Sequence, residues 1–352
     1  MNIRVIMKKL KVLLLIMLSL IVVAGCNSSD QAEKELEDID APIEQHDEEE
    51  KDTEEETEED RETVARELYL LTEDGIVVPQ TFELPKTNEV AAQALEYLVD
   101  GGPITNLLPN GFEAVLPAGT EIIGVDLDEE GTLIVDLSEE FKEYDGDKEQ
   151  QIIQAMTYTL TQFDNVERVK LWVNGFEQNE MPVNGMPIQN GSSRANGINI
   201  LDTDAVDLIN SQAVILYYPS QIGSNIYHVP VTQHVELEGD NLNEEIVRTL
   251  LDGPTYESGL LHVFNPNIEL LNVNETDDGI LHVEFSEEIL ANVNEAYIAD
   301  EVIETLVLSL TDQPEVSGVT ISVENIEQIF NEQGVPYSEP VTRETFVPTG
   351  SL

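Results

Sequence analysis

Cysteine and tryptophan are nearly absent from this 352-residue chain, which has one of each, Cys26 and Trp172. A single cysteine excludes an intrachain disulfide framework. Lysine and arginine are also scarce: 16 of them stand against 71 aspartates and glutamates, giving a formal net charge of −55 at pH 7. A surface of that sign repels nucleic acid and anionic lipid head groups. We therefore expect no nucleic-acid partner.

Familiar catalytic motifs are missing as well. The sequence has no glycine-rich phosphate loop and no Gly-x-Ser-x-Gly nucleophile elbow. Its five histidines show no metal-ligand spacing with the cysteine or with one another. They are His46, His228, His234, His262 and His282. The sequence predicts no enzyme, no cofactor and no metal site.

Two acidic motifs could suggest chemistry, but each has a simpler interpretation. Adjacent carboxylates occur at Glu139-Glu140 and Glu287-Glu288, each pair after a strand pattern and a serine. Neighbouring residues do not face each other across a scissile bond, so we expect capped turns. Asp126-x-Asp128-x-Glu130-Gly131 resembles the start of a calcium loop, yet the position of the bidentate glutamate is Leu137. That stretch predicts a hairpin turn.

The N-terminus has the features of an export signal. Four basic residues precede an apolar run at 12–23: Arg4, Lys8, Lys9 and Lys11. The run is shorter than the ~20 residues of a transmembrane helix. Val22-Val23-Ala24-Gly25-Cys26 resembles a bacterial lipobox, which implies cleavage after residue 25 and a diacylglyceryl group on Cys26. A plain signal peptide or signal anchor is the alternative, and Met1 or Met7 could be the start.

Residues 26–63 form an acidic linker that begins at the lipidated cysteine. Residues 30–62 contain 19 acidic residues and few apolar ones. Such a segment cannot bury enough apolar area to offset its ordering entropy, so we expect disorder. It would span roughly 30 Å as a coil and up to ~120 Å when stretched. A tether is the favoured interpretation, and a specific acidic binding arm is the alternative.

The rest of the chain repeats itself. Residues 131–140 read GTLIVDLSEE and residues 279–288 read GILHVEFSEE, at an offset of 148, and two flanking blocks match in the same order. A repeat of this length indicates two globular domains rather than a solenoid. We place the domains at 64–188 and 212–345. The link 189–211, whose Asn/Gly/Ser-rich start favours flexibility, joins them, and 346–352 form a tail.

Each repeat has the pattern of a small α+β domain, with two helices packed on a mixed or antiparallel sheet. In the first repeat the helices are expected from about Asn88 and over 148–163. In the second they are expected from Asn243 and over 295–311. Trp172 falls in the last strand of the first repeat, where the second has Ser322. It could serve packing or contact a ligand.

The repeated blocks resemble the GerMN domain, which occurs in tandem in spore germination and sporulation lipoproteins. The matching stretches are 98–103, 116–120, 135–141, 157–163 and 166–175. The second repeat departs further from the family pattern. Residues 262–266 stand near the position where the family has Leu-Pro-Gly-Thr, and Glu324-Asn325 stand where an Asn/Asp-Gly β-turn is typical. The resemblance implies a fold similar to the ring-building motif of secretion-type assemblies.

The same resemblance implies a non-enzymatic scaffold in sporulation and spore germination. The membrane would hold it through Cys26 on the extracytoplasmic face, including the space between mother cell and forespore. Its partners would be envelope proteins of that machinery. The alternative is a peptidoglycan-binding module or an accessory factor for wall hydrolysis. Partner identity, oligomeric state, ring assembly and timing stay open at this point.

Overall fold

The fold is seen in a computed structural model that describes residues 62–201, 210–237 and 241–346. All of these residues belong to one structural unit, Thr57–Leu352. The expected signal peptide and Cys26 lie outside the described residues. Among the helices of the described residues, none is long and apolar enough to cross a membrane.

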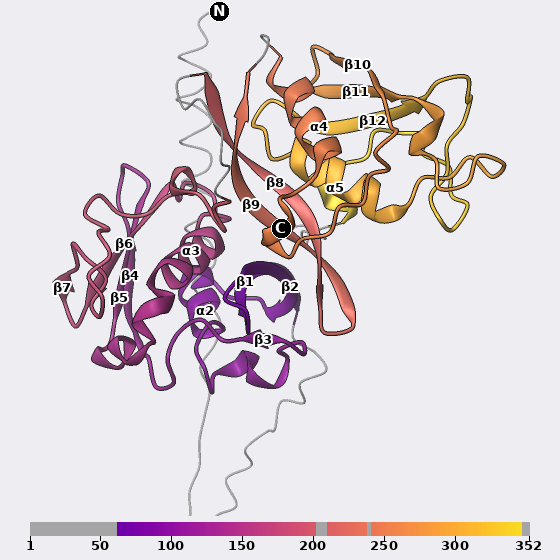
Figure 1. The fold of residues 1–352 in the computed structure, drawn as a ribbon. Helices are drawn as coiled ribbons and strands as arrows, with labels where there is room; N and C mark the ends of the chain where they lie inside the picture. The colour runs from indigo at the N-terminus through magenta and orange to yellow at the C-terminus, as the bar shows by residue number, and fades with distance from the viewer. Residues whose placement is uncertain (1–61, 202–209, 238–240, 347–352) are drawn as a thin grey trace, which may run out of the picture. The chain divides into compact units, whose positions relative to one another are not determined.

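The first repeat contains two sheets and two α-helices (Figure 1). Its strands are β1 (Thr63–Thr72), β2 (Val77–Pro85), β3 (Phe112–Glu113), β4 (Ile122–Leu127), β5 (Thr132–Leu137), β6 (Arg168–Val173) and β7 (Phe176–Glu177). Its helices are α2 (Val90–Glu96) and α3 (Glu149–Leu160). One sheet has the order β2-β1-β3 and the other the order β4-β5-β6-β7. β5 is antiparallel to β4 and parallel to β6, so this sheet is mixed.

The second repeat has the same plan. Its strands are β8 (Ser211–Ile222), β9 (Asn225–Glu236), β10 (Leu270–Glu275), β11 (Ile280–Phe285) and β12 (Gly318–Val323). Its helices are α4 (Leu242–Asp252) and α5 (Asp300–Leu310). β8 and β9 form a hairpin, and β11 lies antiparallel to β10 and parallel to β12. The structure therefore confirms two duplicated α+β domains with mixed sheets.

Alternation along the central strands explains why one face of each mixed sheet is buried. In β5, Leu133, Val135 and Leu137 are buried, while Ile134 and Asp136 between them are partly exposed. A parallel neighbour requires a crossover connection, and α3 provides it between β5 and β6. α3 also packs on β1, as α5 packs on β8 in the second repeat. Helix and strand thus enclose one apolar layer in each repeat.

The helix starts differ from the sequence-based expectation by a few residues. α4 is capped by Asn241, whose Oδ1 accepts a hydrogen bond from Glu244 N at 3.2 Å, and not by Asn243. α5 begins at Asp300, five residues later than expected. The chain before it is held in bridges from Tyr297 to Asn292 and Phe330, which are incompatible with a helix. Tertiary pairing has overridden local helix propensity here.

The start of the link is ordered rather than flexible. Ser192 and Val169 exchange two backbone hydrogen bonds of 2.8 Å. Ser193 and Asn196 then form a capping box around the turn Arg194–Asn196. Ile198 is fully buried. The glycines and serines of this segment therefore form turns, while backbone hydrogen bonds join Ser192 to the first repeat and Ile198 to the second.

Candidate functional site

The paired carboxylates lie at the start of short 3₁₀ turns, as predicted, but the side chains of Ser138 and Ser286 do not cap these turns. Ser138 Oγ accepts a hydrogen bond from Glu121 N at 3.0 Å, immediately before the turn Glu139–Glu143. A hydrogen bond with Ser138 holds the pKa of the exposed Glu140 below its ordinary value. The second repeat has the same arrangement at Ser286, Glu269 and Glu288. These acids complete turns and do not form a facing pair for catalysis.

The calcium-like stretch is the β4–β5 turn. Asp128 Oδ1 accepts hydrogen bonds from Glu130 N and Thr132 N at 2.9 and 2.8 Å, which hold the pKa of Asp128 below its ordinary value. Of the histidines, His282 lies in β11, and His46 is outside the described residues. Within the described ranges, no group of three or more His, Cys, Asp or Glu side chains could hold a metal ion.

Trp172 lies on β6 and is partly buried. Its indole Nε1 is buried and has no hydrogen-bond partner. Burial of that edge means that other groups of the protein cover it. The geometry favours packing for this side chain.

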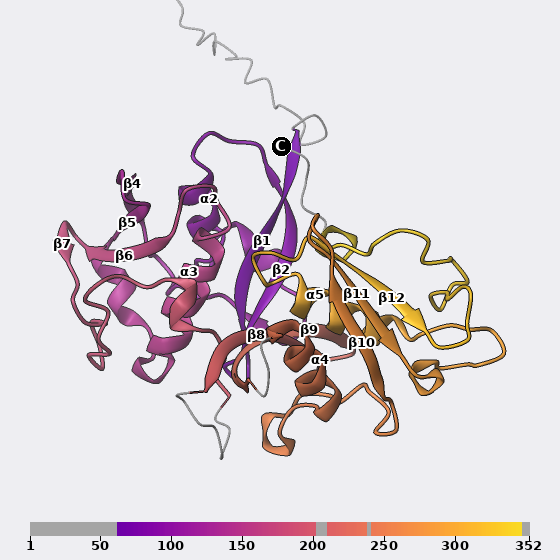
Figure 2. The ribbon, with the colours of Figure 1, turned by 90° about the horizontal axis from the view of Figure 1, so that it is seen from above.

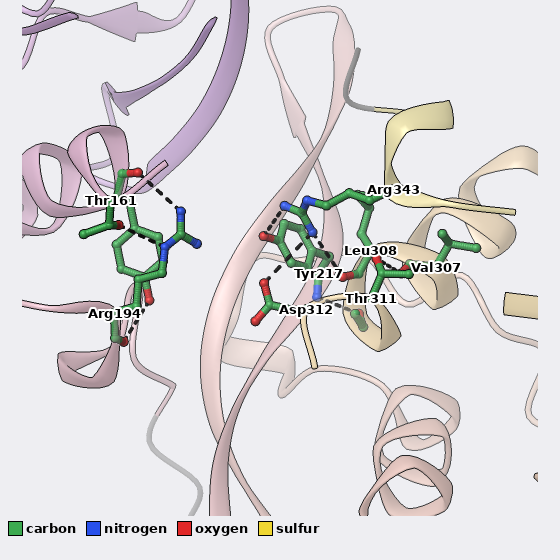
Figure 3. Close-up of polar contacts among 10 residues, drawn as sticks. Thr161, Arg194, Tyr217, Val307, Leu308, Thr311, Asp312 and Arg343 are labelled. Carbon is green, nitrogen blue, oxygen red and sulfur yellow. Dashed lines mark hydrogen bonds and ion pairs between the residues drawn. The ribbon is translucent and has the colours of Figure 1, made fainter. Parts of the chain in front are cut away.

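An arginine closes each repeat, and the first of them is Arg194. It lies in the turn after the last strand of its repeat, with its guanidinium 4.7 Å from the centroid of the Tyr158 ring. Nε donates to Thr161 Oγ1 at 2.9 Å, and Nη2 donates to Tyr158 O at 3.4 Å (Figure 3). The cation thus meets the C-terminal turn of α3, where the helix dipole favours positive charge.

Arg343 occupies the equivalent position in the second repeat. Its guanidinium lies 4.8 Å from the centroid of the Tyr217 ring, and Nη2 donates to the Tyr217 hydroxyl at 2.6 Å (Figure 3). Nη1 donates to Leu308 O at 3.3 Å, near the end of α5, and lies 4.0 Å from Asp312 Oδ1. Burial raises the pKa of Tyr217 to about 12, so its hydroxyl stays protonated at neutral pH.

Sequence reasoning missed this arginine pair, although a signal was present. Arg248 and Arg343 are the only lysines or arginines after Arg194. Arg194 follows a serine and Arg343 follows a threonine, and the two are separated by nearly the repeat offset. Extending the alignment of the repeats past their last strands would have paired them. Their contact with the C-terminal end of a helix could not be predicted from the sequence, because it depends on how the helix and the following turn pack together.

Replacing Arg343 with alanine is expected to lower the free energy of unfolding by about 2–3 kcal/mol, because it leaves the largely buried Asp312 without its nearest cation. Arg248→Ala is the matched control, since this exposed arginine pairs with Glu244 on one helix face and should cost only about 0.5 kcal/mol. Urea unfolding of the full chain measures both. Equal losses in the two variants would contradict the assigned role of Arg343.

Asn199 ties the link to both repeats. Its Oδ1 accepts from Val77 N at 2.9 Å, and its Nδ2 donates to Val77 O at 2.7 Å and to Pro230 O at 2.8 Å. Val77 begins β2 of the first repeat and Pro230 lies in β9 of the second. Asn199 has φ +43°, a left-handed conformation that asparagine tolerates better than most residues. We call this arrangement the Asn199 clasp.

A cavity of about 280 Å³ lies where the repeats meet. Its lining includes Glu67 and Gln80 from the first repeat and Tyr217, His228 and Arg343 from the second. His228 Nδ1 lies 3.1 Å from a Glu304 carboxylate oxygen and His228 Nε2 lies 3.2 Å from Thr305 Oγ1, so this ring is committed to α5. His228 therefore contacts its own repeat at this cavity rather than bridging to the other one.

Comparison with known proteins accounts for the duplicated fold. The profile of the Germane family, described as sporulation and spore germination, matches residues 67–179 and 215–328. The chain belongs to the Germane family. Within that family it is similar to the spore germination protein GerM of Bacillus subtilis (strain 168), with 40% identity over 332 residues, covering 94% of this chain and 87% of the relative.

A solved structure shows the same Germane repeats in tandem. The tandem GerMN domains of the sporulation protein GerM from Bacillus subtilis match the chain with a TM-score of 0.73 and 42% identity. The match covers 82% of this chain and 100% of that one. The family resemblance and the duplicated architecture expected from sequence are both confirmed.

Proposed function

We propose that this Germane protein is a lipid-anchored, non-enzymatic scaffold that acts in sporulation and spore germination. Cys26 holds it on the extracytoplasmic face of the membrane, residues 27–62 provide reach, and the two repeats bind envelope proteins between mother cell and forespore. The observation that carries the proposal is the tandem of sporulation-family domains, which follows a stretch that resembles a lipobox.

The chemistry of the described residues supports a binding role. The carboxylates first considered for catalysis complete turns, and the arginines that close the repeats contact helix ends and tyrosines. Glu149, which is 3% exposed, accepts hydrogen bonds from backbone groups of a neighbouring loop. A general acid or base needs a perturbed group open to a substrate, whereas these groups are held in internal contacts.

A wall-digestion assay tests the non-enzymatic part. The full chain, purified in detergent, is incubated with peptidoglycan sacculi, and soluble fragments are measured alongside the amount of protein that sediments with the wall. The proposal predicts no release of fragments and no sedimentation above that of a boiled sample. Released fragments would show an enzyme, and sedimentation without release would favour the wall-binding alternative.

A further inference from the structure

The junction between the repeats contains apolar contacts as well as the Asn199 clasp. The rings of Phe112 in β3 and Tyr227 in β9 meet edge to face, with centroids 5.0 Å apart. A Cβ built on Gly111 would lie 2.9 Å from Ile222 Cγ2, so only glycine fits where the tip of the β8–β9 hairpin meets the first repeat. β2 also packs against β9 (Figure 2). Backbone, ring and amide contacts therefore join the two domains.

Four charged residues at this junction balance one another, and we call them the junction tetrad. They are Glu67 and Arg194 from the first repeat side and Asp312 and Arg343 from the second. Glu67 shares the junction cavity with Arg343. Burial raises the pKa of Asp312 above its ordinary value, while Arg343 and also Arg194, from the other repeat side, act to lower it. Glu67 and Arg343 thus line one cavity from opposite repeats, and Arg343 lies 4.0 Å from Asp312 within the second repeat.

Glu67 shows how strongly this arrangement depends on a fixed orientation. Its Oε1 is buried and forms no hydrogen bond with the described residues. A buried carboxylate oxygen in that state is unfavourable unless a cation is nearby, and Arg343 of the second repeat lines the same cavity. Rotating one repeat relative to the other would leave Glu67 without that compensation.

We propose that the two repeats form one rigid body, whose mutual orientation is specified by the Asn199 clasp and the junction tetrad. Tandem domains move relative to each other by default unless their interface is extensive. Here an alternative orientation would break the hydrogen bonds that Asn199 makes to both repeats and would separate Glu67 from Arg343, and buried polar groups can select one arrangement by that penalty.

The solved relative supports the proposal independently. The Germane match to either repeat spans less than a third of the chain, at 67–179 or 215–328. A TM-score of 0.73 over 82% of the chain therefore requires both repeats to superpose at once. Two proteins that are 42% identical thus share one mutual orientation of the repeats. Independently moving domains would have no reason to adopt it twice.

Spin-label distances test the rigid body. The full chain carries Cys26→Ser, with labels on cysteines introduced at the exposed Glu96 on α2 and Glu287 in the second repeat. We expect one narrow distance maximum. Asn199→Asp keeps the acceptor for Val77 N but replaces the donor to Val77 O and Pro230 O with a carboxylate oxygen. This change should abolish the narrow maximum, while Asn190→Asp, in an exposed part of the same link, should not.

Circular dichroism of each variant shows whether the repeats are still folded. A broad distribution in the parent chain would overturn the rigid body. A narrow one that persists in Asn199→Asp, with the fold intact, would overturn the role of the clasp. Should Asn199→Asp unfold the chain, the pair Glu67→Gln and Asp312→Asn replaces it, and the proposal predicts broadening there without loss of helical signal.

Discussion

Replacing Cys26 with alanine is expected to move the protein from the membrane fraction to the soluble fraction of the envelope. The apolar run at 12–23 belongs to the expected signal peptide, and the lipid on Cys26 is the membrane attachment proposed for the mature chain. An acyl chain contributes about 0.8 kcal/mol per buried CH₂, and two chains are needed for stable attachment. Loss of the thiol therefore removes the whole attachment, and fractionation followed by immunoblotting measures it.

Ser28→Ala provides the matched control, because it changes a small residue two positions away without touching the thiol. It should fractionate with the membrane as the parent does. If Cys26→Ala stayed in the membrane fraction at the size of the processed parent, processing and attachment would not depend on the thiol, and the lipobox interpretation would be wrong.

Replacing Glu149 with alanine is expected to lower the free energy of unfolding by about 3–5 kcal/mol. The change leaves several buried hydrogen-bond donors without an acceptor, and each such donor costs about 1–3 kcal/mol. Its carboxylate accepts hydrogen bonds from Asn184 N, Met186 N, Val183 N and the Tyr144 hydroxyl, at 2.7, 3.0, 3.0 and 2.8 Å. The side chain lies at the start of α3 and fixes the loop at 183–186. Urea unfolding of the full chain measures the loss.

The same site predicts a pH dependence. Burial acts to raise the pKa of Glu149, but the hydrogen bonds from Asn184, Met186, Tyr144 and Val183 outweigh it and lower the pKa below the ordinary value of 4.5. The ionised form is thus favoured by folding. Its contribution is complete at neutral pH and is lost as the pH falls from about 4.5 through the lower folded value.

Two controls sharpen the Glu149 experiment. Glu149→Gln keeps one carbonyl acceptor and should retain part of the stability while losing the acid dependence assigned to this group. Glu96→Gln changes an exposed glutamate on α2 and should leave the unfolding free energy within about 0.5 kcal/mol of the parent. Equal stability of Glu149→Ala and Glu96→Gln would contradict the assigned role.

The repeated sequence blocks were sufficient to predict the domain type and most strands. Alternation in GTLIVDLSEE and GILHVEFSEE placed β5 and β11 correctly, because a period of two marks one buried face of a strand whatever its neighbours are. The turn at Asp128 followed from its own side chain, which bonds the backbone two and four residues ahead. Features of this kind depend only on residues close together in the chain, so they can be predicted from the sequence.

The junction could not be predicted in this way. Asn199 lies in a stretch that looks like a linker, and its two partner residues, Val77 and Pro230, are 122 and 31 positions away in sequence. Glu149 and the loop at 183–186 likewise meet only in the folded chain. In the second repeat, Asn331 Oδ1 instead accepts from Gln333 N and Val335 N, so comparing the repeats does not reveal the Glu149 site. Long-range polar contacts carry no periodic signature.

The central claim is that the anchored tandem works by binding envelope proteins. Photo-crosslinking in sporulating cells tests it most directly, with a crosslinking amino acid placed at exposed positions of either repeat, such as Phe176 and Tyr256, and mass spectrometry of the products. The account predicts adducts with envelope proteins that vanish when Cys26→Ala releases the chain. Adducts with peptidoglycan fragments alone, or an unchanged protein set in Cys26→Ala, would contradict it.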